Sequence, residues 1–95
     1  MLTPKQLDII KNILSSKLDP ELYSVFIFGS RATGLHEEYS DIDLGIEGKP
    51  LDAKTKIELE EAFEESDLPF SVDLVDFSTV NNKFRQIAKQ QIITL

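Results

Sequence analysis

A Gly-Ser pair at positions 29 and 30 is followed, after ten intervening residues, by two aspartates, Asp41 and Asp43. A strand that ends in Gly-Ser at a helix start leaves backbone N–H groups and a small hydroxyl free to bind phosphate oxygens. Two carboxylates two residues apart on a strand project from the same face and offer hard oxygens to one point, which suits Mg²⁺. The spacing therefore predicts a site for a metal-bound polyphosphate, built from Gly29, Ser30 and the two aspartates.

Asp73 is expected to supply a third carboxylate. It interrupts the apolar run 72–75, where an unpaired buried carboxylate would be costly, so a metal or another cation is expected to compensate it. A second metal ion, about 3.5 to 4 Å from the first, can activate an acceptor hydroxyl if a third carboxylate completes its binding. Asp76 is the rival for this role, but it lies on the opposite face of the strand and is expected to cap the last helix.

Three short runs are expected to form the strands that position these side chains. The run 23–28 is rich in β-branched and aromatic residues and ends at the glycine of the Gly-Ser pair. The run 41–46 alternates strictly, so its aspartates share one face while its isoleucine and leucine side chains enter the core. The run 70–77 carries the third aspartate.

Three further segments have the apolar periodicity of a helix. The first, 4–18, follows Thr3, which has the sequence of a capping box. The second, 53–66, is rich in glutamate and is expected to expose a hydrated acidic face. The third begins at Ser78, as N-cap, and its apolar stripe continues to the last residue, so a closing helix is expected over 78–95.

The order of helices and strands predicts an α/β fold, in which a small mixed β-sheet is flanked by helices. The first two strands are close in sequence, so they can form an antiparallel pair. A chain of 95 residues fits a single domain, residues 1–95. Such a small domain has a thin core and is expected to depend on a partner or ligand, in a hetero-oligomer.

Composition excludes several classes of function. Ten Lys and Arg residues against 17 Asp and Glu give a net charge of −7, the wrong sign for direct nucleic-acid binding through many phosphates. The sequence has no cysteine, which excludes disulfide scaffolds, thiolate zinc sites and cysteine nucleophiles. No apolar run is long enough to span a membrane and the N-terminus does not look like a signal peptide, so a cytoplasmic protein is expected.

The stretch from about residue 25 to 44, with the aspartate at 73, resembles the DNA polymerase beta-like nucleotidyltransferase superfamily. The short chain is similar to its minimal branch, the MNT-type antitoxins. By this resemblance the Gly-Ser pair would bind phosphate and the three aspartates would hold metal, with an arginine following the pair as in many members. The residues that match are Gly29, Ser30, Arg31, Asp41, Asp43 and Asp73.

The resemblance implies transfer of AMP from Mg²⁺-bound ATP, with two ions, to a hydroxyl and release of pyrophosphate. In MNT antitoxin pairs the acceptor is a tyrosine of a cognate HEPN-type toxin, an RNase that the modification silences. Two alternatives stay open. The chain could neutralise its partner by complex formation without catalysis, or it could be the catalytic subunit of a small-molecule nucleotidyltransferase of the antibiotic-modifying kind.

Single residues also leave alternatives open. Arg31 could contact phosphate or neutralise the neighbouring aspartates. A calcium loop starting at Asp41 is disfavoured, because glycine falls one place early at Gly45 and the twelfth position is Asp52 rather than glutamate. His36, the only histidine, lies among glutamates and is expected to face solvent.

Overall fold

The computed structural model describes residues 2–29 and 41–95. In these two ranges the chain forms four strands and three helices. The elements, in chain order, are α1 (Pro4–Lys17), β1 (Tyr23–Phe28), β2 (Ile42–Gly48), α3 (Ala53–Glu64), β3 (Val72–Asp76), α4 (Asn82–Ala88) and β4 (Ile93–Thr94). The predicted α/β fold is confirmed, and five of the six predicted elements match these bounds to within a few residues.

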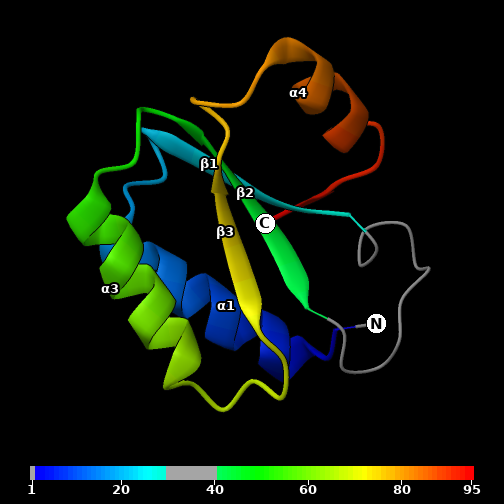
Figure 1. Cartoon of the computed structure of the whole chain (residues 1–95). Coiled ribbons are helices and arrows are strands. Elements are labelled where there is room, and N and C mark those ends of the chain that lie inside the picture. The colour runs from blue at the N-terminus through cyan, green and yellow to red at the C-terminus, as the bar shows by residue number, and fades with distance from the viewer. Residues whose placement is uncertain (1, 30–40) are drawn as a thin grey trace.

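The strands form one mixed sheet in the order β3-β2-β1-β4 (Figure 1). β1 runs antiparallel to both β2 and β4, whereas β2 and β3 are parallel. The expected antiparallel pairing of the first two strands is therefore confirmed. The register places Asp43 of β2 opposite Phe28 on one side and Asp73 on the other, so these three side chains lie on the same face of the sheet.

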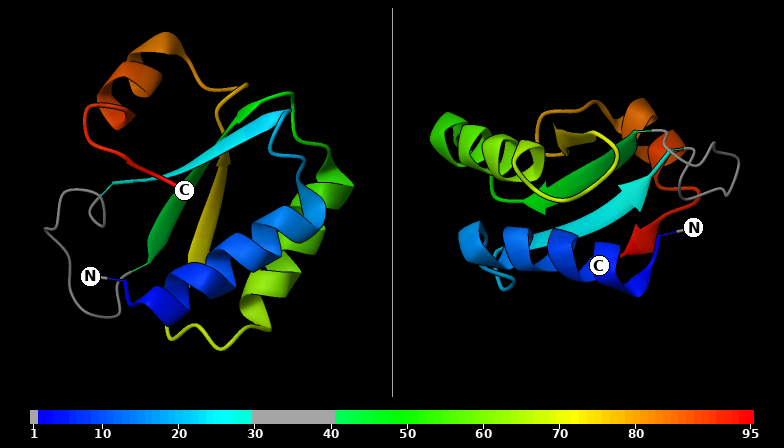
Figure 2. Two further views of the ribbon diagram at one scale, coloured as in Figure 1. Left: turned by 180° about the vertical axis from the view of Figure 1, so that it is seen from behind. Right: turned by 90° about the horizontal axis from the view of Figure 1, so that it is seen from below.

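One face of the sheet packs against α1 and α3, which lie side by side (Figures 1 and 2). The alternating residues of β2 that were expected to enter the core are completely buried there. The apolar stripes of the two helices complete this core as predicted. Its buried members are Ile10, Leu14, Leu18, Ile27, Ile42, Leu44, Ile46, Leu59, Phe63 and Leu74.

The opposite face carries a second, aromatic core under α4. Phe77 is completely buried, and its ring lies 4.9 Å from that of Phe26 and 5.2 Å from that of Phe28, both nearly edge-on. Gly45 of β2 makes room for this cluster, because a Cβ atom there would lie 2.5 Å from the Phe26 ring and 2.8 Å from the Phe77 ring. The aromatic core therefore depends on a glycine in the middle of β2.

Side chains cap the described helices as their sequences suggest, except at α4. Thr3 and Gln6 form the predicted capping box of α1, and Asp52 caps α3 by accepting from the Thr55 N–H. None of the described helices has the length and apolar character needed to cross a membrane.

The closing segment differs from the prediction. Ser78 does not cap α4, because its N–H and hydroxyl both donate to the Asp76 carboxylate in a turn, and Asn81 provides the cap instead. The helix ends at Ala88 rather than continuing to residue 95. Ile93 and Thr94 form β4, since β1 still has an unpaired edge that the returning chain can occupy.

Candidate functional site

The site begins where β2 and β3 start, on the face of the sheet that α4 partly covers. Asp43 and Asp73 are register partners in neighbouring parallel strands, so both side chains leave the sheet in the same direction. Asp41 lies one residue before β2 and is exposed. The structure therefore brings Asp43 and Asp73, which are distant in sequence, side by side.

The three aspartates interact electrostatically. Partial burial raises the pKa of the Asp43 carboxyl above its ordinary value of 3.8, and the neighbouring carboxylates of Asp73 and Asp41 raise it further. Both causes penalise the ionised form, one through lost hydration and the other through repulsion between like charges. The arrangement thus costs free energy in the folded protein and is suited to a cation.

The prediction that Asp73 is buried is wrong. Among the described strands β3 lies at the edge of the sheet and pairs with β2 alone, and the side chain of Asp73 is exposed. Its position beside Asp43 nevertheless agrees with the role that the sequence suggested. Exposure leaves the Asp73 carboxylate accessible to a ligand.

Asp76 has a structural role that differs from the predicted cap of the last helix. One oxygen of its carboxylate accepts from Ser78, and the other accepts from the Leu51 N–H at 3.0 Å. Although partial burial opposes ionisation, these hydrogen bonds lower the pKa of Asp76 overall. Asp76 thereby ties the end of β3 to the segment before α3 and does not compete with Asp73 for the site.

Gly29 joins β1 to the site through a contact with Asp43. Its backbone has a φ of 77°, which side-chain-bearing residues rarely adopt, and a Cβ atom there would lie 2.6 Å from Asp43 Oδ2. The space that was expected to admit a phosphate therefore borders directly on the Asp43 carboxylate. Ser30 and Arg31, the other predicted phosphate-binding residues, and His36 lie outside the described residues.

The substitution Gly29→Ala is expected to destabilise the protein by about 1–2 kcal/mol, the cost of a left-handed backbone for a residue with a Cβ atom. It should also displace the Asp43 carboxylate, because the added methyl group would overlap it. Chemical denaturation would measure the first effect and Mg²⁺ titration the second. An unchanged midpoint of unfolding with unchanged Mg²⁺ binding would contradict this account of Gly29.

The described side chains do not form a complete metal site by themselves. Among residues 2–29 and 41–95, no group of three or more His, Cys, Asp or Glu side chains is arranged to hold a metal ion. Mg²⁺ commonly takes only one or two carboxylates and completes its shell with water and substrate phosphates. The adjacent carboxylates of Asp43 and Asp73, with Asp41 close by, fit an ion that arrives with a polyphosphate.

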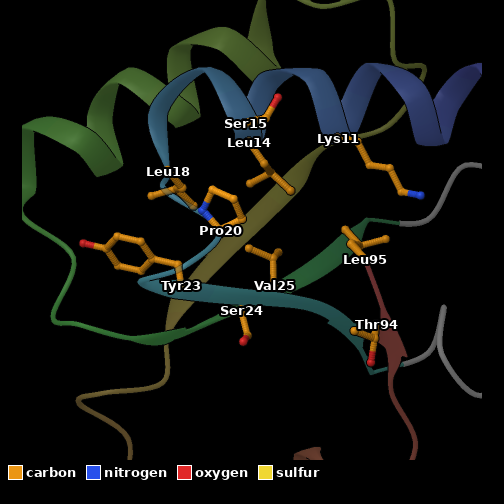
Figure 3. Close-up of a pocket in the computed structure, with 10 residues that line it drawn as sticks. All are labelled: Lys11, Leu14, Ser15, Leu18, Pro20, Tyr23, Ser24, Val25, Thr94 and Leu95. Carbon is orange, nitrogen blue, oxygen red and sulfur yellow. The ribbon is translucent and has the colours of Figure 1, made fainter.

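Two cavities of the described structure lie on opposite faces of the sheet. One, of about 440 Å³, lies between the end of β1 and α4 and includes Phe28 and Gly29 in its lining. The other, of about 280 Å³, lies between α1 and β1 and is shown in Figure 3. Only the first is on the face that carries Asp43, so it is the cavity that a substrate of the acidic site can reach.

An ionic cluster fixes α4 over the sheet. Glu47 of β2 accepts a 2.8 Å hydrogen bond from Lys89 and lies 3.9 Å from the Arg85 guanidinium. Arg85 also donates to the backbone carbonyl of Phe77. These contacts hold one wall of the 440 Å³ cavity in place. Sequence reasoning missed this cavity, because it assigned Phe84 and Ile87 to a core stripe, although they are 41% and 58% exposed.

Comparisons with known proteins identify the family of the chain. The family model of the nucleotidyltransferase domain matches residues 7–95. A Haemophilus influenzae protein named "Probable protein adenylyltransferase MntA" is 44% identical over 92 residues, covering 96% of this chain and 79% of its own length.

Two solved structures share the fold. A toxin–antitoxin crystal structure with AMP-PNP superposes with a TM-score of 0.73 at 27% identity, over 92% of this chain and 69% of that one. A complex of tri-AMPylated Shewanella oneidensis HEPN toxin with MNT antitoxin superposes with a TM-score of 0.66 at 26% identity. The match covers 95% of this chain and 70% of that one. Both structures and the Haemophilus relative agree with the family match, and the chain belongs to the nucleotidyltransferase domain family, in its group of MntA-like protein adenylyltransferases.

Proposed function

We propose that this chain transfers AMP from Mg²⁺-bound ATP to a tyrosine hydroxyl of a cognate HEPN-type toxin, and so acts as the antitoxin of the pair. The observation that carries the proposal is the position of Asp43, between Gly29, which follows β1, and Asp73 of β3. Its support from relatives is the name of the Haemophilus protein and the AMPylated toxin in the Shewanella complex.

Each residue of the site has a distinct task in this proposal. Asp41, Asp43 and Asp73 would hold two Mg²⁺ ions, which would supply positive charge against the triphosphate and lower the pKa of the acceptor hydroxyl. Gly29, with Ser30 and Arg31 after it, binds the phosphates. The protein thus acts mainly by positioning, since its described part brings carboxylates rather than a nucleophile to this face.

The transfer is a substitution at the α-phosphorus of ATP. A bond forms from the tyrosine oxygen to the α-phosphorus, and the bond from that phosphorus to the oxygen bridging it to the β-phosphate breaks. The hydroxyl proton is lost as the new bond forms, and the electron pair of the broken bond leaves with pyrophosphate. Because the acceptor is part of a folded partner, the exposed position of Asp73 at the sheet edge favours its access.

The test is to incubate the purified chain and its HEPN-type partner with ATP labelled in the α-phosphate and Mg²⁺. Label should appear on the partner, and chelation of the metal with EDTA should remove it until Mg²⁺ is restored. Mass spectrometry should then find an added AMP on a tyrosine. ATP labelled in the γ-phosphate is the matched control and should leave the partner unlabelled.

The same assay separates the two alternatives. A chain that neutralises its partner only by complex formation would suppress the RNase activity of the toxin without ATP and would add no label. A small-molecule nucleotidyltransferase would label an aminoglycoside and leave the partner protein unmodified. Either result would contradict protein AMP transfer.

A further inference from the structure

We infer that the 440 Å³ cavity between the carboxyl end of β1 and α4 binds the adenine base of the substrate nucleotide. This inference rests on the proposed function and adds to it the residues that would recognise the nucleoside. The lining residues are Phe28, Gly29, Phe84, Ile87, Ala88, Gln90 and Gln91. Its volume lies within the range of about 300–1,000 Å³ that is usual for small-molecule sites.

The position of the cavity is the first argument. In a nucleoside triphosphate a single ribose separates the α-phosphate from the base, so the base must lie close to the reacting phosphorus. Gly29 lines the cavity and lies close to the Asp43 carboxylate, since a Cβ atom on it would lie 2.6 Å from Oδ2. The cavity therefore starts where the predicted metal site ends, on the same face of the sheet.

The chemistry of the lining is the second argument. Phe28 and Phe84 offer aromatic surface, and their rings lie 6.2 Å apart and nearly perpendicular. A base has a planar π-face that stacks on such side chains. Gln90 and Gln91, both exposed, add side-chain amides that carry a donor and an acceptor, the pair of groups that adenine presents on one edge.

Two other cavities among the described residues fit a nucleotide less well. The 280 Å³ cavity lies beside α1, on the face of the sheet opposite Asp43 (Figure 3). A third, of about 310 Å³, is lined by the carboxylates of Glu60 and Glu64, which would repel an anionic ligand. The cavity beside α4 has no acidic side chain among its described lining residues.

The partial exposure of the cavity residues is the third argument. Phe84 is 41% exposed and Ile87 is 58% exposed, although both are large apolar residues. Arg85 and Lys89 pair with Glu47 of β2 and so hold α4 against the sheet. The apolar wall is thus held in place from the sheet, and its free surface faces a substrate-sized space.

The experiment compares two charge-matched variants of the chain, Ile87→Glu and Gln86→Glu. Both add one negative charge to α4 at an exposed residue, but only Ile87 lines the cavity. Binding of ATP and of inorganic triphosphate, each with Mg²⁺, is measured by titration calorimetry. Ile87→Glu should weaken ATP binding about tenfold more than Gln86→Glu, the scale of one lost base contact, while both variants bind triphosphate alike.

A second variant covers the case in which Ile87→Glu unfolds. Phe84→Leu keeps an apolar side chain but removes the π-face, so it should weaken ATP binding several-fold and leave triphosphate binding unchanged.

Replacing Gln90 and Gln91 together with alanine should reduce the preference for ATP over GTP. Changed triphosphate binding in Phe84→Leu, or an unchanged preference for ATP in the glutamine variant, would count against the assignment.

Failure of this inference can be told apart from failure of the proposed function. If the unmodified chain bound ATP no more tightly than inorganic triphosphate, the base site would be refuted while phosphate binding by the acidic site would stand. If it bound neither, the nucleotidyltransferase proposal itself would fail. Equal loss of ATP binding in Ile87→Glu and Gln86→Glu would assign the effect to charge and also refute the base site.

Discussion

Asp43→Asn is expected to lower the rate of AMP transfer at least about a hundredfold, because Mg²⁺ contributes several kcal/mol of transition-state stabilisation and each 1.36 kcal/mol is tenfold in rate. Asparagine has the size of aspartate but lacks its charge, so the contact with Gly29 is preserved. Initial rates of label transfer to the partner measure the effect. Asp8→Asn, on the exposed side of α1, is the matched control and should keep the original rate.

The same substitution should slightly stabilise the protein in the absence of metal. Burial and two neighbouring carboxylates raise the pKa of Asp43 in the folded state, so the folded chain binds this proton more tightly than the unfolded chain. Stability is therefore lost as the pH rises through the folded pKa. Solvent screens the half-exposed carboxyl, so the gain in Asp43→Asn should stay below about 1 kcal/mol.

Unfolding measurements over a range of pH check the direction of this stability change. The difference in unfolding free energy between Asp43→Asn and the original chain should be smallest below pH 3.8, the ordinary pKa of the group, and should grow toward neutral pH. Mg²⁺ should stabilise the original chain more than the variant. A variant that is both inactive and much less stable than the original chain would point to misfolding and would contradict a direct role for Asp43.

Phe77→Ala is expected to destabilise the protein by about 3–5 kcal/mol, the usual cost of removing a buried aromatic side chain. Phe77 is completely buried, and its ring packs against those of Phe26, Phe28 and Phe84. The loss is a large part of the roughly 5–15 kcal/mol that stabilises a typical domain. Urea denaturation followed by circular dichroism measures it.

Leu22→Ala is the control for this core substitution. Leu22 is 45% exposed, so its truncation should change the unfolding free energy by no more than about 0.5 kcal/mol. Because Phe77 also supports Phe28 and Phe84, Phe77→Ala should weaken nucleotide binding in the fraction that remains folded. If Phe77→Ala lowered the unfolding free energy as little as Leu22→Ala does, the aromatic core would be refuted as a main source of stability.

Local sequence patterns were sufficient to predict most of the sheet and the acidic pair at the start of β2. The strict alternation around Asp43 determines which face its carboxylate occupies, whatever the rest of the fold does. The pairing of Asp43 with Asp73 depends on strand order, which periodicity did not give; the resemblance implied only that the two aspartates share one site. The exposure of Asp73 was missed because it depends on β3 lying at the sheet edge, which no local pattern encodes.

The closing segment shows why the remaining structure could not be predicted. Its apolar residues repeat at helical spacing through Leu95, yet α4 ends at Ala88 and the chain continues into β4. The free edge of β1 decides this outcome, and β1 is distant in sequence. The cavity is equally nonlocal, since Phe28 and Ile87 meet only after the sheet and α4 have assembled.

β4 has a consequence for the behaviour of the protein in concentrated solution. Its two residues pair with Phe26 and Ile27, and the Leu95 N–H donates to the Val25 carbonyl. Without them, a row of backbone amides and carbonyls on an apolar strand would be open to pairing with another molecule. Because β4 is so short, it offers little free edge to which another molecule could pair. We therefore expect β4 to limit self-association, and its deletion to promote aggregation.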